Sequence, residues 1–312
     1  MIDTHLHLSH HLFDAQFSYL ARNNEGGYTI QQGTREELMG QLLAAGVSCC
    51  IDPGISIVSN EKLLTLAERW PGFVYGAVGV HPTRTWEYKI LSRGKTCTAR
   101  LHWKERRKLD EFLQHPAVVA VGETGLGYHH PRKEHHRLRP MAWFIYQLRL
   151  AHRHSLPLIL HIREADTDAL RILKRSRHWL HGGVCHCFCG TSELAAAYTA
   201  LGLKLGIGGS LLTDGPRARR LEQAVAATSL EFLLLETDGP YVLPSCPQLD
   251  KKKRRKVRNT SLILPAVAER IAELKNVPVE EVLRVTSENA VRLFGLPSQP
   301  AFPSAVPAPC EA

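Results

Sequence analysis

Alternation between short apolar runs and helical segments is the feature that most constrains the fold of this chain. Eight times in succession, an apolar run of strand length precedes a stretch with helical periodicity or helix-capping residues. The predicted strands are residues 1–7, 47–52, 73–80, 118–121, 157–160, 183–185, 203–207 and 232–235. Regular alternation of this kind implies parallel strands joined by right-handed crossovers. Eight units over about 290 residues therefore predict a (β/α)8 TIM barrel rather than an open sheet.

The domain organisation follows from the same alternation. A chain of 312 residues has the length of one large α/β barrel, and it shows neither an internal repeat nor a central linker. We therefore expect one barrel domain over residues 1–296. Residues 297–312 contain five Pro and little apolar content, and we expect this tail to be disordered. Residues 8–33 are too long for an ordinary turn and are interpreted as a lid or binding loop, and residues 83–102 as an extended βα loop.

Composition excludes several classes of protein. No stretch approaches the 18 consecutive apolar residues of a membrane span, and no secretory signal is visible at the N-terminus. The eight Cys are irregularly spaced in a long chain, which indicates reduced thiols rather than a disulfide framework. Cys185, Cys187 and Cys189 lack the spacing and the partner pair of a zinc knuckle. We expect a cytoplasmic protein, most simply a monomer, with no membrane partner.

Histidines and acidic residues recur at the predicted C-terminal ends of the strands. This is the rim that carries the active site in TIM barrels. The residues are His5, His7, His81, Glu123, His161, His186, Glu236 and Asp238. Each has an ordinary structural interpretation: His161 could be a satisfied histidine at a strand end, and Asp238-Gly239-Pro240 could be a turn. If each residue had only its separate structural role, all of them would lie at the same end of the barrel by chance. We therefore favour a common site.

The residue types at this rim indicate a metal centre. Imidazole and carboxylate together bind divalent cations such as Zn, Mn or Mg. The predicted ligands could hold two ions, with Glu123 as the bridging carboxylate. Two adjacent ions can activate a water and stabilise the attacking and leaving oxygens of a phosphodiester. Asp238 could hold one ion and also orient or deprotonate that water.

The net charge of +9 and the pI of about 9.2 favour a polyanionic partner such as nucleic acid. Much of the excess lies in residues 251–256, after the eighth strand, on the side that faces the predicted site. We favour contact of Lys253 and Arg254 with DNA phosphates, although a solvated charge run or a nuclear-import signal would show the same pattern. Arg163, two residues after His161, could clamp a phosphate at the same rim.

The motifs around these residues resemble those of the TatD family of metal-dependent deoxyribonucleases. They are residues 3–7, 79–82, 121–126, 160–161, 186–190 and 235–241, and they occur in order over about residues 1–296. The resemblance implies an amidohydrolase-like TIM barrel and a Mg- or Mn-dependent nuclease, often a 3′ to 5′ exonuclease on DNA and sometimes RNA. It further implies that His5, His7 and Asp238 bind one ion, that His161 and His186 bind the second, and that Glu123 bridges them. His81 and Glu236 would support the ligands or contact the substrate.

This chain departs from the family pattern at three places. Gly127 replaces the usual Asp, Cys189 replaces a usual Ser, and Thr260-Ser261 replaces a usual Glu-Pro. All six implied metal ligands are nevertheless present, so we expect an active enzyme. Two alternatives stay open. One is another amidohydrolase-type reaction on a small amide, lactone or phosphoester, although Glu123 stands where many such barrels use a modified Lys. The other is a non-catalytic nucleic-acid-binding barrel, which the cost of burying a metal-free cluster disfavours.

Overall fold

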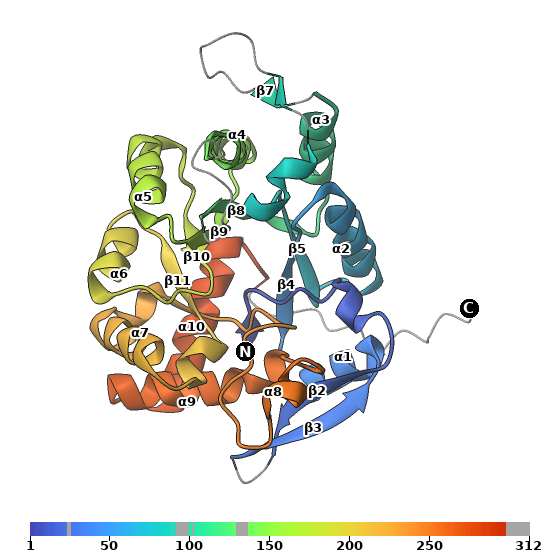
Figure 1. The fold of residues 1–312 in the computed structure, drawn as a ribbon, viewed down its shortest axis with the longest axis vertical. Coiled ribbons are helices and arrows are strands. Elements are labelled where there is room, and N and C mark those ends of the chain that lie inside the picture. Colours follow the sequence, from blue (N-terminus) through green and yellow to red (C-terminus); the bar gives the residue numbers. More distant parts are fainter. Residues whose placement is uncertain (24–25, 89, 92–99, 102, 129–136, 298–312) are drawn as a thin grey trace.

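The computed structural model describes residues 1–23, 26–88, 90–91, 100–101, 103–128 and 137–297. The predicted disordered tail, apart from Pro297, and most of residues 89–102 lie outside these ranges. The described residues form an eight-stranded parallel sheet surrounded by helices (Figure 1). The strands, in spatial order, are β1 (Ile2–Asp3), β4 (Cys49–Pro53), β5 (Val74–Val78), β8 (Val118–Gly127), β9 (Leu158–Arg163), β10 (Gly183–Cys185), β11 (Lys204–Ile207) and β12 (Leu233–Leu235).

Backbone contacts between the first and last strand segments close the sheet into a barrel. The Thr4 N–H donates to the Leu235 carbonyl at 3.0 Å, and the Asp238 N–H donates to the His5 carbonyl at 2.8 Å. An isolated parallel bridge joins Leu6 to Gly239. The predicted TIM barrel is therefore confirmed, and its closure brings together segments more than 200 residues apart in the sequence.

Helices cover the outside of the barrel in the predicted alternation (Figure 1). Their starts follow local capping chemistry: Thr34 and Glu37 form a reciprocal capping box at α1, and Ser56 and Ser59 form one at α2. The α-helices are α1 (Arg35–Ala44), α2 (Ile57–Arg69), α3 (Trp103–Phe112), α4 (Leu138–His154), α5 (Asp166–Arg175), α6 (Ser192–Thr199), α7 (Pro216–Ala227), α8 (Lys251–Arg254), α9 (Leu264–Lys275) and α10 (Val279–Phe294).

The barrel interior is filled by apolar side chains from successive strands. Ile2, Ile51, Ile159 and Leu234 belong to one buried cluster, and Phe294 at the end of α10 packs against it. The larger cluster between sheet and helices includes Trp143 of α4. Because the interior is packed, a ligand can bind only at an end of the barrel and not inside it. Among the described residues, no helix is long and apolar enough to cross a membrane.

Two predicted elements were wrong. The first strand was predicted over residues 1–7, but β1 ends at Asp3, with a single bridge at Leu6. Residues 8–33 were interpreted as one long lid or binding loop, but they contain the short helix η1 (His11–Phe13) and an antiparallel hairpin, β2 (Phe17–Arg22) and β3 (Tyr28–Gly33). The hairpin is completed by β13 (Val257–Arg258), which pairs with β2. This partner lies too far along the chain for local pattern to show it.

Candidate metal centre

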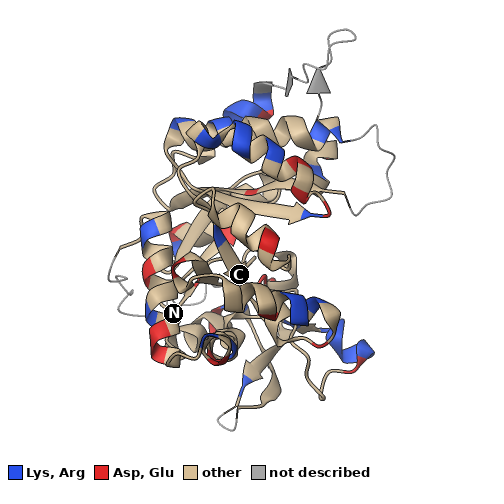
Figure 2. Ribbon diagram, turned by 90° about the vertical axis from the view of Figure 1, so that its left-hand side faces the viewer, with Lys and Arg blue, Asp and Glu red and all other residues tan. Residues whose placement is uncertain are grey.

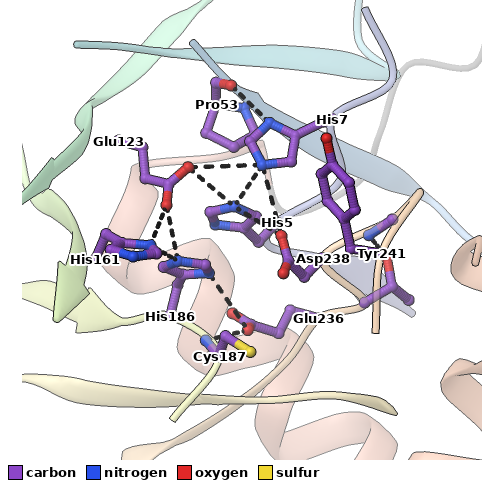
Figure 3. A network of polar contacts seen from close by, with 12 residues as sticks. His5, His7, Pro53, Glu123, His161, His186, Cys187, Glu236, Asp238 and Tyr241 are labelled. Atoms are coloured by element: carbon purple, nitrogen blue, oxygen red, sulfur yellow. Dashed lines mark hydrogen bonds and ion pairs between the residues drawn. The ribbon is translucent and has the colours of Figure 1, made fainter. Parts of the chain in front are cut away.

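The predicted ligands come together at one end of the barrel (Figure 3). Glu123 and His161 lie within β8 and β9, which continue beyond their predicted ends because Gly125 pairs with His161. The other predicted ligands lie within four residues after the ends of β1, β10 and β12. The structure thus gathers into one cluster all six residues that the sequence suggested: His5, His7, Glu123, His161, His186 and Asp238. The His and acidic residues at the separate strand ends form one site only because the barrel closes.

A first donor group consists of His5, His7 and Asp238. His5 Nε2 lies 3.3 Å from His7 Nε2 and 3.6 Å from Asp238 Oδ1, and His7 Nε2 lies 3.5 Å from the same oxygen. Nitrogen and oxygen ligands about 2.1 Å from a tetrahedral ion are about 3.4 Å apart. The three side chains therefore have the spacing of ligands that share one cation.

A second donor group surrounds Oε1 of Glu123. His161 Nδ1 lies 2.7 Å from this oxygen, His186 Nε2 lies 2.9 Å from it and His81 Nε2 lies 3.3 Å from it. The other oxygen, Oε2, faces the first donor group, 3.7 Å from His5 and 3.6 Å from His7. Each oxygen of Glu123 thus faces a different donor group, which is the arrangement a carboxylate needs to bridge two ions.

The cluster fits a cation better than it fits a set of internal hydrogen bonds. His5 Nδ1, His161 Nε2, His186 Nδ1 and Glu236 Oε2 are buried and have no hydrogen-bond partner among the described residues. Imidazole nitrogens face one another across the cluster, as His5 and His7 do, and only one of each such pair can donate. The converging atoms are all types that coordinate divalent metals.

Buried neighbours orient the ligands. His7 Nδ1 lies 3.0 Å from the Pro53 carbonyl, so its N–H donates there and Nε2 turns into the cluster. Asp3 is buried and supports the rim from below. It accepts hydrogen bonds from the hydroxyls of Thr237 and Ser261, both at 2.6 Å, and from the His5 N–H at 3.1 Å. Asp3 therefore holds the backbone between the ligands and is not itself a member of the donor groups.

Charge in the cluster also favours a cation. Burial holds the pKa of His5 well below its ordinary value and lowers the pKa of His161 to about 4, so both imidazoles are neutral, as ligands must be. Burial acts the same way on His7 and His186. There, however, Asp238 and Glu123 outweigh it and raise the pKa of each to about 9. The carboxylates thus attract positive charge into the cluster.

A cavity of about 260 Å³ opens over the cluster. Its walls include five of the six predicted metal ligands, all except His5. They also include Tyr241 and four residues that were not predicted for the site: His10, Ile55, Thr83 and Arg84. His10 and Arg84 belong to the connections after the first and third strands, so their place beyond strand ends was an available signal. His81, which we expected to support the ligands or contact the substrate, lines this cavity and also stands beside Glu123 and His161 in a group that could hold a metal.

Comparison with known proteins decides the family. The model of the family described as TatD related DNase matches residues 2–295. The chain belongs to this family. It is 33% identical over 264 residues to the 3′-5′ ssDNA/RNA exonuclease TatD of Edwardsiella piscicida, with 85% of this chain and 94% of the relative covered. It is 32% identical to an uncharacterized metal-dependent hydrolase TatD of Mycobacterium tuberculosis, with 84% and 92% covered.

A solved structure agrees with the sequence comparison. The crystal structure of a TatD homologue from Escherichia coli K12 superposes with a TM-score of 0.75 at 26% identity, and the match covers 95% of this chain and 98% of the homologue. The chain is thus a TatD-family, metal-dependent hydrolase of the kind that acts on ester bonds. Three groups of side chains could hold its metal: His5, His7 and Asp238; His81, Glu123 and His161; and His5, His186 and Glu236.

The departures from the TatD pattern have distinct structural settings. Gly127 ends β8, opposite Arg163, so no carboxylate is present at that strand end. Cys189 is a partly buried free cysteine. Ser261 has a clear local effect, because its hydroxyl supplies one of the hydrogen bonds that hold Asp3, which a proline could not do.

The residues predicted to contact the substrate lie farther apart from one another than the predicted metal ligands do. Glu236 is buried and accepts a hydrogen bond from the Cys187 N–H, so it braces the loop beside His186. Arg163 is exposed but does not line the central cavity. Lys253 is exposed on α8, and the Arg254 guanidinium donates to the carbonyls of Leu243 and Pro244. Arg254 therefore contributes to the loop's structure and also lines a neighbouring cavity.

Proposed function

We propose that this protein is a deoxyribonuclease that hydrolyses phosphodiester bonds of DNA, most simply from the 3′ end, with two divalent ions bound per subunit. The observation that carries the proposal is the position of Glu123, whose two oxygens face two separate donor groups. Such a pair of ions, Mg or Mn with Zn as a further candidate, supplies Lewis acidity at the phosphate and an activated water. The names of the TatD relatives support a nucleic-acid substrate, DNA and also RNA.

The exposure of each side chain to the cavity indicates its role in the reaction. We assign His5, His7 and Asp238 to one ion, His161 and His186 to the other, and Glu123 to both. The Glu123 side chain is only 3% exposed, so its role is to hold charge. The Asp238 side chain is 16% exposed and lines the cavity, so it can also orient a water and accept its proton. His81 would hold Glu123 in place from the cavity wall or contribute to the second ion.

A panel of metals against substrates tests this function. Purified protein should shorten DNA strands with Mg or Mn and lose that activity with a chelator. Glu123→Ala should bind less metal and show no nuclease activity, while Arg107→Ala, on the exposed face of α3, should behave as wild type. Hydrolysis of small lactones or esters, with no action on DNA or RNA under any metal, would instead support the amidohydrolase-type alternative. The cytoplasmic location and the monomeric state stay predictions.

A further inference from the structure

Two cysteines beside the metal centre differ from the other described cysteines in exposure. Of the six free cysteines among the described residues, four are buried, and the two that are partly exposed are Cys187 and Cys189. They lie two residues apart in the loop that follows β10, directly after the predicted ligand His186. None of the groups of described residues that could hold a metal includes a cysteine. The chemistry of this pair is therefore that of accessible thiols and not of metal ligands.

The residue between the two cysteines, Phe188, fixes the loop against the core. Its ring is buried and packs edge-on against Tyr198 of α6, with ring centroids 6.4 Å apart, and its N–H donates to the Gly206 carbonyl at 3.1 Å. The backbone turns just before it, because Cys187 has a φ of +47°. With Phe188 anchored in this way, the two flanking side chains meet, and the Cys187 S–H donates to the sulfur of Cys189.

The surroundings of Cys189 favour its thiolate form. Besides Cys187, the hydroxyl of Ser210 in the short helix η5 (Gly209–Leu212) and the guanidinium of Arg217 donate to its sulfur. Arg217 lies in the first turn of α7, on the side of the molecule that faces the viewer in Figure 2. Together these donors outweigh burial and lower the pKa of Cys189 to about 6. A thiolate is the form of cysteine that attacks a peroxide.

We propose that Cys187 and Cys189 are a peroxide-sensitive modification site, in which oxidation joins the two sulfurs in a disulfide and weakens metal binding at His186. The Cys189 sulfur attacks one oxygen of hydrogen peroxide, the O–O bond breaks, and a sulfenic acid forms as the released hydroxide takes up a proton. The Cys187 sulfur then attacks the sulfenic sulfur, the S–O bond breaks, and the hydroxide leaves as water with the Cys187 proton. Two thiols are oxidised, and one peroxide is reduced to two waters.

Cys187 connects this pair to the metal ligands. It follows His186 directly, and its N–H donates to the buried carboxylate of Glu236. A covalent bond draws together two sulfurs that are now hydrogen-bonded, so the backbone at Cys187 has to shift. We expect this shift to move His186 Nε2, which lies 2.9 Å from Glu123 Oε1, out of the second donor group. The disulfide does not depend on the proposed function, whereas the loss of metal rests on its assignment of His186 as a ligand.

Thiol labelling followed by mass spectrometry tests the disulfide. The full-length protein is treated with hydrogen peroxide, freed of peroxide by catalase, unfolded and alkylated. It should carry two fewer labels than the reduced protein, in which all eight Cys react. Treatment with a reductant before alkylation should restore the two labels. An oxidised protein that still carries all eight labels would overturn the proposal.

Single substitutions assign the disulfide to this pair. Cys189→Ser, which introduces the residue that the family usually has at this position, should lose no labels after peroxide. Cys187→Ser should form no disulfide and should leave Cys189 as a sulfenic acid, which dimedone labels. Cys246→Ser is the matched control and should lose two labels, as wild type does. A disulfide that still forms in Cys187→Ser or Cys189→Ser would lie elsewhere in the chain and would contradict the proposal.

Titration with Mn, followed by calorimetry, tests the connection to the metal centre. After peroxide has been removed, the oxidised protein should bind Mn several-fold more weakly than the reduced protein, and a reductant should reverse the loss. Cys189→Ser should bind Mn equally before and after peroxide. Equal binding by oxidised and reduced wild type would overturn the connection to His186. If the reduced protein binds no divalent metal at all, the proposed function fails, while thiol labelling still decides whether the disulfide forms.

Discussion

At the scale of residues, the two carboxylates of the cluster occupy different environments. Glu123 is enclosed by imidazoles, which hold its pKa well below the ordinary range even though burial acts to raise it. Asp238 is held at the Gly239 turn and borders the cavity. One carboxylate is thus shielded and fixed, and the other is accessible to water. This asymmetry is what the chemistry of a hydrolase needs from an otherwise similar pair of side chains.

Removing the charge of Asp238 tests this division. We expect Asp238→Asn to lower kcat about 10²- to 10⁴-fold, the range for loss of a group that moves a proton, while the protein retains the ion of the second donor group. Metal content measured by mass spectrometry, together with single-turnover kinetics, checks both parts. Asp168→Asn, on the outer helix α5, is the control and should retain wild-type kcat. Wild-type turnover in Asp238→Asn would remove this residue from the mechanism.

A second prediction at the scale of residues concerns Ser261. Its hydroxyl donates to the buried carboxylate of Asp3, 258 positions away in the sequence. Ser261→Ala should lower the free energy of unfolding by about 1–3 kcal/mol, because a buried acceptor loses a partner. Urea denaturation measures the loss. Ser287→Ala, which removes a hydroxyl that only bonds back to the Leu283 carbonyl within α10, is the control, and an equal loss there would contradict a specific role for Ser261.

At the scale of elements, the start of a helix is set by residues close together in the sequence, whereas the small sheet beside the barrel depends on residues far apart in the sequence. Helix α1 begins where Thr34 and Glu37 satisfy each other's backbone N–H groups, a pattern readable over four residues. The β2–β3 hairpin, in contrast, is completed by β13, which directly follows the basic segment. This small sheet therefore fixes the position of α8 and its cations relative to the metal centre.

The cap of α1 can be tested by one substitution. Thr34→Ala should cost about 1 kcal/mol, because the Glu37 N–H loses its acceptor at the helix start. Thermal unfolding of the metal-free protein should then occur a few degrees lower. Thr65→Ala, within α2, removes a hydroxyl that donates to the Glu61 carbonyl one turn earlier in the same helix, and it should change stability much less. Equal effects of the two substitutions would exclude a capping contribution.

At the scale of the whole molecule, burial of the polar cluster lowers the stability of the folded protein, and the packed apolar clusters of the barrel offset this loss. The cluster places several imidazoles and two carboxylates together in a buried region, with unpartnered atoms among them. A bound cation would relieve this arrangement in the folded state and would find no such site in the unfolded chain. Metal binding should therefore raise the free energy of unfolding, an effect that can be measured without any catalytic assay.

We accordingly expect Mn or Zn to raise the midpoint of thermal unfolding. At a concentration of 100 times the dissociation constant, one ion adds about 2.7 kcal/mol. Calorimetric scans with and without metal measure the shift. Glu123→Gln should show a much smaller shift than wild type, because it alters the group shared by both donor sets. A full wild-type shift in this variant would contradict the bridging role assigned to Glu123.

The sequence alone determined the barrel and the identity of the clustered residues. Each strand is a short apolar run, and each of these His or acidic residues lies within a strand or at most four residues beyond its end. Local pattern and the rule for parallel barrels were therefore sufficient to place them at one rim. The second strand end, at Asp52-Pro53, was overlooked because the contribution of Pro53 is a backbone carbonyl that no residue type reveals.

Only the tertiary structure decided how these residues are arranged. That His81 stands beside Glu123, that His161 presents Nδ1, and that the two oxygens of Glu123 face different groups depend on side-chain rotation within a closed barrel. The pairing of β13 with β2 and the hydrogen bond from Ser261 to Asp3 join opposite ends of the chain. Local periodicity reports what one segment buries, and it carries no information about which distant segment will lie against it.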